Sequence, residues 1–298
     1  MKKILLTGAS GFLGRHIKLY ANKKLYKIYD CNSKKGNLEN INNLKIFNNI
    51  KFDYIFHCAT KAKAGSYSQT HKGEQWLQNQ LINTNILYYW RDFQPQAKMI
   101  AMGSSCMYSQ KLKMLEENNL KGDVEEELYT YGMTKRMLLL GLINFSKEYN
   151  LRYLFFIPSV LYGPKYDLDD HHFIFDFIRK INISKKKQKK VEFYGSGREK
   201  RDLIYIKDAV DIIFKSLKYK NEIFNLASGK EYTIKKYAQM IADLFYYDRK
   251  NILFLGKKNN SVKSRKLIVS KIKKYVKFKN TKLFDGLNRT VDYFKSCN

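Results

Sequence analysis

The sequence predicts an α/β fold, with a Rossmann-type, doubly wound parallel sheet followed by a smaller C-terminal α/β part. Three observations predict it. Short apolar segments alternate with longer helical segments over the first half of the chain, as in parallel sheets. A glycine-rich turn follows the first apolar segment. Ser104 stands just past the end of a later one, at the sheet edge where open α/β sheets bind ligands.

The first elements are a strand over residues 2–7, a glycine turn over 8–14 and a helix over 15–21. Glycines let the backbone turn tightly and approach a pyrophosphate, and the helix N-terminus offers free N–H groups and a positive dipole. The spacing is GxxGxxG. We therefore predict a dinucleotide site here. The residues expected to contact the cofactor are Gly8, Gly11, Phe12, Leu13 and Gly14.

A second strand, over residues 26–29, ends in Asp30. An acid at this point binds the adenosine ribose diol of NAD. Lys34 and Lys35 follow closely, and lysines there would instead neutralise the 2′-phosphate of NADP. The predicted cofactor is therefore NADP or NAD.

Further elements alternate along the chain. Strands are expected over 53–60, 98–103, 152–157, 191–194 and 223–226, and helices over 75–93, 131–148, 173–183, 208–217 and 233–246. We expect residues 1–157 to form the dinucleotide-binding domain, with 195–222 returning to it. Residues 158–194 and 223–298 are expected to form the second part.

Tyr131 and Lys135 lie four residues apart on an expected helix and so share a face. A free tyrosine titrates near pH ~10 and is a poor base at neutral pH. A nearby ammonium, joined by an oxidised nicotinamide, is expected to lower its pKa. Ser104 would hold a substrate hydroxyl or carbonyl. Together these groups would move a proton while a cofactor moves a hydride.

The chain has 298 residues and a formal net charge of +29. A basic surface suits nucleic acid or phosphorylated small molecules. However, Lys, Asn, Ile, Tyr and Phe are abundant together, which A/T-rich codons explain, and the lysines are scattered apart from the run at 184–190. We expect no nucleic-acid partner. A basic nucleic-acid-binding protein on a Rossmann scaffold is the distant alternative.

No run of about 20 apolar residues is present, so no membrane span is expected. The strand and glycine turn begin at the N-terminus, which argues against a cleaved signal peptide. The four cysteines lack CxxC spacing, which predicts neither a metal site nor a disulfide framework. A cytoplasmic location follows from these expectations.

These features together resemble the extended short-chain dehydrogenase/reductases, the NAD-dependent epimerase/dehydratase family, which modify nucleotide sugars. Within it, the sequence is most similar to the GDP-L-fucose synthases, which epimerise and reduce GDP-4-keto-6-deoxymannose. The segments that carry the resemblance are Thr7–Gly14, Asp53–Thr60, Gly103–Tyr108, Tyr131 with Lys135, Leu161–Pro164, His172–Lys180, Gly195–Asp208, Asn225–Gly229 and Thr281–Tyr293.

The resemblance implies a role for each matching residue. Ser104 and Tyr131 would bind and protonate the C4 oxygen of the sugar, and Lys135 would hold the nicotinamide ribose. Cys106 and His172 would be the acid/base pair that inverts carbons beside the C4 ketone, although His171 stands next to His172.

The remaining contacts also come from the resemblance. Ala59 would touch the cofactor, and Ser105, Arg201 and Lys180 would bind the substrate. The implied substrate is a nucleotide sugar, with a GDP-sugar favoured, and the implied assembly is a homodimer.

The predicted activity is therefore an NAD(P)H-dependent reductase, and also a C3/C5 epimerase, of a nucleotide-linked 4-keto-6-deoxy sugar in surface glycan precursor synthesis. An NAD-dependent NDP-sugar 4-epimerase is the alternative, because the segment after Asp30 is similar to those enzymes. The chain also departs from the fucose synthases. Val160 replaces an asparagine, Ser109 replaces a proline, and the loop between Pro164 and His172 is shorter.

Overall fold

The computed structural model describes residues 1–24, 26–31, 37–62, 70–256 and 262–297. Six strands form a sheet in the order β2-β1-β3-β4-β5-β9, and every neighbouring pair is parallel. The strands are β1 Lys3–Thr7, β2 Lys27–Cys31, β3 Tyr54–His57, β4 Lys98–Met102, β5 Tyr153–Pro158 and β9 Glu222–Leu226. The predicted α/β class with a parallel sheet is confirmed.

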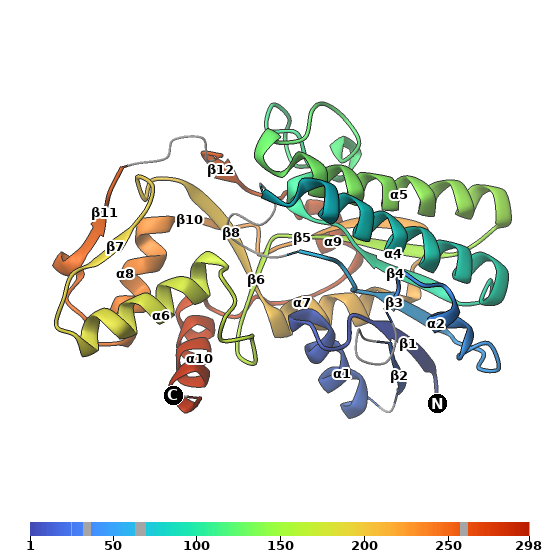
Figure 1. The fold of residues 1–298 in the computed structure, drawn as a ribbon, viewed down its shortest axis with the longest axis horizontal. Coiled ribbons are helices and arrows are strands. Elements are labelled where there is room, and N and C mark those ends of the chain that lie inside the picture. The colour runs from blue at the N-terminus through green and yellow to red at the C-terminus, as the bar shows by residue number, and fades with distance from the viewer. Residues whose placement is uncertain (25, 32–36, 63–69, 257–261, 298) are drawn as a thin grey trace.

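Helices cover both faces of this sheet (Figure 1). On one face, α4 (Lys72–Phe93) packs against α5 (Tyr129–Tyr149), and on the other α1 (Phe12–Lys23) packs against α7 (Ile206–Lys215). The central strands are buried on both sides, so most of their residues are apolar. After β1 the chain places β2 on one side of it and then crosses to place β3 on the other side. In open α/β sheets, ligands bind beside the carboxyl ends of the strands at such a change of direction.

The second part has its own small sheets and core. Strand β8 (Lys200–Tyr205) pairs with β6 (Val160–Tyr162), β10 (Glu231–Thr233) and β12 (Ser264–Arg265), and β7 (Val191–Phe193) pairs with β11 (Ile252–Phe254). Helices α6 (Phe173–Lys186), α8 (Ile234–Leu244) and α10 (Leu283–Ser296) surround a separate apolar cluster. The two other described helices, α2 (Asn42–Lys45) and α9 (Ser270–Tyr275), pack on the first core.

Two expected boundaries are wrong. Strand β8 falls in the segment 195–222 that was expected to return to the dinucleotide-binding domain, yet it pairs in the small sheet. Strand β9 was expected in the second part, yet it is the edge strand of the large sheet beside β5. Buried apolar strands of the two sheets have similar sequences. The sheet to which each strand belongs is decided by its pairing with segments far away in the chain. Helix α7, in the same segment as β8, packs on α1.

None of the described helices combines the length and the apolar character needed to cross a membrane.

Candidate active site

The glycine turn has the shape of a phosphate cradle. Gly8 adopts φ +68°, and a Cβ there would lie 2.6 Å from the backbone nitrogen of Ala59. A Cβ on Gly14 would collide with the carbonyl oxygen of Gly8. Gly11 caps helix α1 and donates its N–H to Gly8 O at 3.0 Å. The absent side chains leave room for a pyrophosphate at a helix N-terminus, so these residues fit a dinucleotide.

The neighbouring predicted contacts lie around this turn. Ala59 donates its N–H to Thr7 Oγ1 at 3.3 Å, which holds the end of β3 against β1. Phe12 packs edge-on against Phe175 of α6, with ring centroids 5.7 Å apart, so it joins the turn to the second part. Leu13 is partly buried and packs on the main core.

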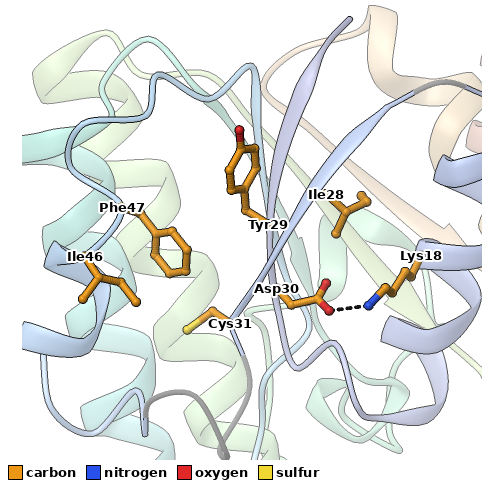
Figure 2. Close-up of a pocket in the computed structure, with 7 residues that line it drawn as sticks. All are labelled: Lys18, Ile28, Tyr29, Asp30, Cys31, Ile46 and Phe47. Atoms are coloured by element: carbon orange, nitrogen blue, oxygen red, sulfur yellow. Dashed lines mark hydrogen bonds and ion pairs between the residues drawn. The ribbon is translucent and has the colours of Figure 1, made fainter.

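Asp30 lies at the end of β2, beside a cavity of about 300 Å³. Figure 2 shows its carboxylate facing Lys18 of α1, with which it forms an ion pair. The other oxygen, Oδ1, is buried and has no hydrogen-bond partner among the described residues. A buried acceptor without a partner is costly, so it suits a hydroxyl pair such as a ribose diol. Lys34 and Lys35 lie outside the described residues.

The serine and tyrosine meet at the carboxyl edge of the sheet. Ser104 follows β4 and caps the 3₁₀ turn Ser105–Met107, with its Oγ accepting the N–H of Cys106 at 3.2 Å. Tyr131 projects from the first turn of α5 and hydrogen-bonds through its side chain to Ser104 and Thr60. The predicted pairing of Ser104 with Tyr131 is thus present in the structure, and Thr60 is an addition that sequence reasoning missed.

The pKa of Tyr131 differs from the expectation. Burial raises it well above the ordinary tyrosine value, helped by the nearby Cys106, and the hydrogen bonds from Ser104 and Thr60 only partly offset this rise. The expected lowering by the Lys135 ammonium is therefore not the dominant effect, because desolvation penalises the phenolate more strongly. In this site Tyr131 is a protonated phenol at neutral pH, which is the form that a proton donor requires.

Lys135 is buried one turn after Tyr131, with only 4% of its surface exposed. Its Nζ lies 5.7 Å from the centroid of the Tyr131 ring. Burial lowers its pKa to about 8, and the nearby Cys58 only weakly opposes this. Burial and the Lys135 charge lower the pKa of His57 to about 4, so His57 stays neutral between Thr7 and Asn83. Both ring nitrogens of His57 are thus engaged inside the sheet.

Cys106 lies in the 3₁₀ turn directly after Ser104, and its thiol contacts a residue that sequence reasoning missed. Arg265 Nη1 donates to Cys106 Sγ at 3.2 Å, and its Nη2 forms an ion pair with Glu125. Ser105, the predicted substrate contact, is buried within the same turn.

The structure does not bring His172 to Cys106. His172 begins α6 with 53% of its side chain exposed, and its Nδ1 lies 2.6 Å from Asp170 Oδ1. His171 lies beside it, with its Nδ1 3.2 Å from Arg179 Nη2. The helix start was predicted correctly, whereas the position of the imidazole depends on Asp170, which the motif does not include.

The two remaining substrate candidates also lie in the second part. Lys180 on α6 forms an ion pair with Asp176 at 3.0 Å. Arg201 on β8 donates to the carbonyl oxygens of Lys200 and Val262 at 2.8 Å each. Arg201 pairs in register with Arg265 of β12. A negative charge on Cys106 would stabilise the charged Arg201 guanidinium. Arg201 is therefore close to the thiol, whereas Lys180 is engaged elsewhere.

The described residues contain no group of three or more His, Cys, Asp or Glu side chains that could hold a metal ion.

Comparison with known proteins identifies the family of the chain. Residues 4–227 match the model of the NAD dependent epimerase/dehydratase family. The chain belongs to this family. The match spans the glycine turn, Asp30, Ser104, Tyr131 and Lys135, and thus covers the large sheet from β1 to β9. The family resemblance inferred from the motifs is confirmed.

Two relatives of known name are similar to this chain over most of its length. GDP-L-colitose synthase of Yersinia pseudotuberculosis is 28% identical over 98% of this chain and 97% of its own length. GDP-L-fucose synthase of Dictyostelium discoideum is 24% identical over 88% of this chain and 85% of its own.

Solved structures share the fold. A GDP-6-OMe-4-keto-L-xylo-heptose reductase from C. jejuni has a TM-score of 0.90 at 20% identity, covering 100% of this chain and 98% of that one. A GDP-L-fucose synthetase from Naegleria fowleri bound to NADP has a TM-score of 0.88 at 24% identity, covering 99% and 93%.

Proposed function

We propose that this chain is an NAD(P)H-dependent reductase, and also a C3/C5 epimerase, of a GDP-linked 4-keto-6-deoxy sugar. The observation that carries the proposal is the hydrogen-bonded pair of Ser104 and Tyr131, with Lys135 beneath and Cys106 beside it, at the carboxyl edge of the sheet. The names of the full-length relatives, a GDP-L-colitose synthase and GDP-L-fucose synthases, support a GDP-sugar substrate.

The cofactor is NAD or NADP. The glycine turn would hold its pyrophosphate, Asp30 its adenosine ribose, and Lys135 its nicotinamide ribose. When bound, the reduced nicotinamide supplies a hydride to the ketone carbon of the substrate. The residues of the chain supply the binding, the proton and the exclusion of water.

Reduction needs a proton at the C4 oxygen. Ser104 and the Tyr131 phenol would both hydrogen-bond this oxygen, which orients the ketone and stabilises the negative charge that develops there. Tyr131 then donates its proton to the oxygen, because burial keeps the phenol protonated at neutral pH.

Epimerisation needs a second pair of groups. A C4 ketone acidifies the protons on C3 and C5. Cys106 lies in the 3₁₀ turn that Ser104 caps, and Ser104 would hold that ketone. Cys106 would exchange a proton with the ring carbon on one face. His172 is proposed as the partner on the other face, and this role requires its imidazole to leave Asp170 when the substrate binds.

Turnover in heavy water tests this proposal. With GDP-4-keto-6-deoxymannose and NADPH or NADH, we expect consumption of the reductant and deuterium at C3 or C5 of the product, measured by NMR. In the Cys106→Ser variant we expect the deuterium at these carbons to fall at least about tenfold, because an alcohol ionises far less readily than a thiol.

The alternative of an NAD-dependent NDP-sugar 4-epimerase is favoured by one observation, the unpartnered Asp30 oxygen that suits the ribose diol of NAD. The same assay separates the two activities. Turnover of an NDP-sugar at C4 without added reductant, together with tightly bound NAD in the purified protein, would replace the reductase proposal.

A homodimer is part of the proposal. Helices α4 and α5 lie side by side on one face of the sheet (Figure 1). Both helices expose large apolar side chains to solvent. These side chains are Trp76, Leu77, Leu81, Tyr88, Tyr129, Met137 and Leu140. Exposed large apolar side chains on two adjacent helices are typical of an interface between identical subunits.

Sedimentation velocity tests both the dimer and the absence of a nucleic-acid partner. We expect a dimer that random duplex DNA does not shift at about 150 mM salt. Leu77→Arg on α4 should give monomers, whereas Leu19→Arg, at an exposed leucine on the opposite face, should not. A wild-type monomer, or a complex with DNA, would contradict the proposal.

We also place the enzyme in the cytoplasm. All four cysteines are free, which suits a reducing compartment. Cell fractionation that finds the chain in a membrane or secreted fraction would contradict this location.

A further inference from the structure

The Cys106 thiol forms part of a three-residue cluster that the reductase chemistry does not use. Arg265 donates one guanidinium N–H to Cys106 Sγ at 3.2 Å and another to the Glu125 carboxylate. The side chains of Arg265 and Glu125 are only 14% and 7% exposed. Solvent therefore screens this cluster weakly, and its charges act strongly on one another.

The backbone on both sides fixes the position of Arg265. Strand β12 is parallel to β8, and Arg265 pairs in register with Arg201. Just after it, Leu267 forms a bridge with Met114, and Ile268 donates its N–H to Met114 O at 3.1 Å. Met114 belongs to the loop that follows the Cys106 turn, so the guanidinium is tied to the segment that carries the thiol.

The chemistry of the cluster favours an ionised sulfur. An arginine is always protonated, and its fork of donors holds a carboxylate and a second acceptor at once. A cation within hydrogen-bond distance stabilises a thiolate relative to a thiol. Glu125 holds the guanidinium in place and balances part of its charge. A plain structural ion pair would need no third partner, and here the third partner is a proposed acid/base residue.

We propose that Arg265, held by Glu125, is a positioning residue that fixes the Cys106 sulfur beside Ser104 and favours its thiolate form. This inference rests on the proposed epimerase role of Cys106 and adds the residue that prepares it.

The step that this arrangement prepares is a proton transfer. The thiolate takes a proton from the carbon beside the C4 ketone, so the C–H bond breaks and an S–H bond forms. The electron pair of the broken bond moves into an enolate, whose oxygen is held by Ser104 and Tyr131. The same carbon then takes a proton on its other face from a second acid, and the thiol loses its proton to water.

Alkylation of Cys106 tests the proposal without any sugar. The full-length protein is treated with iodoacetamide from about pH 6 to about pH 10, and modification of each cysteine is followed by peptide mass spectrometry. In Arg265→Met, we expect Cys106 to react about tenfold more slowly near neutral pH, because its sulfur loses the neighbouring cation. In Arg265→Lys, which keeps a cation, the rate of Cys106 alkylation near neutral pH should return at least halfway to the wild-type value.

Two controls accompany this measurement. Lys263→Met removes the same charge from an exposed residue two positions earlier and should leave the Cys106 profile unchanged. Cys297, which is exposed and near the C-terminus, reports on general reactivity within each sample.

An unchanged Cys106 profile in Arg265→Met would overturn the proposal, and so would a raised KM for the sugar with unchanged alkylation. If Arg265→Met does not fold, Arg265→Gln replaces it, and an unchanged rate of Cys106 alkylation in that variant overturns the proposal. Because alkylation needs no GDP-sugar, a positive result stands even if the proposed substrate is not turned over.

Discussion

Replacing Tyr131 with phenylalanine is expected to lower turnover of the 4-keto sugar by at least about a hundredfold, since a positioned general acid contributes about that much or more. The phenol hydrogen-bonds Ser104 and Thr60 at the carboxyl edge of the sheet. Burial keeps it protonated, so its loss removes the proposed proton donor for the C4 oxygen. The rate of reductant oxidation with saturating sugar measures this effect.

The control for this substitution lies two residues away. Tyr129→Phe removes the hydroxyl of an exposed tyrosine on the same helix and should leave the rate unchanged. The free energy of unfolding of Tyr131→Phe, measured with urea, should also lie within about 1 kcal/mol of the wild-type value. A Tyr131→Phe enzyme that keeps wild-type turnover would show that another group protonates the sugar.

Lys135→Met is expected to make the empty protein more stable and the enzyme nearly inactive. The lysine is 4% exposed, and its ammonium makes no hydrogen bond to another described residue. Burial lowers its pKa from 10.5 to about 8. Since one pKa unit corresponds to about 1.4 kcal/mol, the buried charge costs up to about 3 kcal/mol at neutral pH. Methionine fills the same space without this cost.

The pH dependence follows from the direction of the shift. The folded chain releases the Lys135 proton at lower pH than the unfolded chain does, so the cost is fully present below about pH 8. It disappears as the pH rises toward 10.5, and this contribution makes wild type gain stability over that range. Urea unfolding of both proteins at neutral and alkaline pH should show the difference between them shrinking.

Lys147→Met is the matched control, because Lys147 is exposed on the same helix. It should change neither stability nor activity. A Lys135→Met protein that is less stable than wild type at neutral pH would contradict the burial cost. One that keeps normal activity would contradict the role in holding the nicotinamide ribose.

The sequence predicted those features of the fold and the site that depend on residues close together in the chain. The glycine turn, Asp30 at the end of β2 and the strand before Ser104 all lie within short segments of fixed spacing. The Tyr131 and Lys135 pair could be placed on one helix face by counting residues. These features determine the large parallel sheet and its carboxyl edge.

Long-range pairing determined what the sequence did not predict. Arg265 reaches Cys106 across 159 positions and Glu125 across 140, and no spacing rule connects them. Pairing with distant segments also explains why β8 lies in the small sheet and β9 in the large one, contrary to expectation. The raised pKa of Tyr131 also depends on burial by distant segments, whereas the helix spacing suggested the effect of Lys135 alone.

The most direct test of the central claim uses a reduced nicotinamide cofactor deuterated at its transferable position, in ordinary water with the GDP-linked 4-keto-6-deoxy sugar. We expect NMR of the product to show deuterium at C4 of the sugar, and Tyr131→Phe to form this product far more slowly. If the sugar is converted at the normal rate while the label stays on the cofactor, the site does not reduce the C4 ketone and the account is wrong.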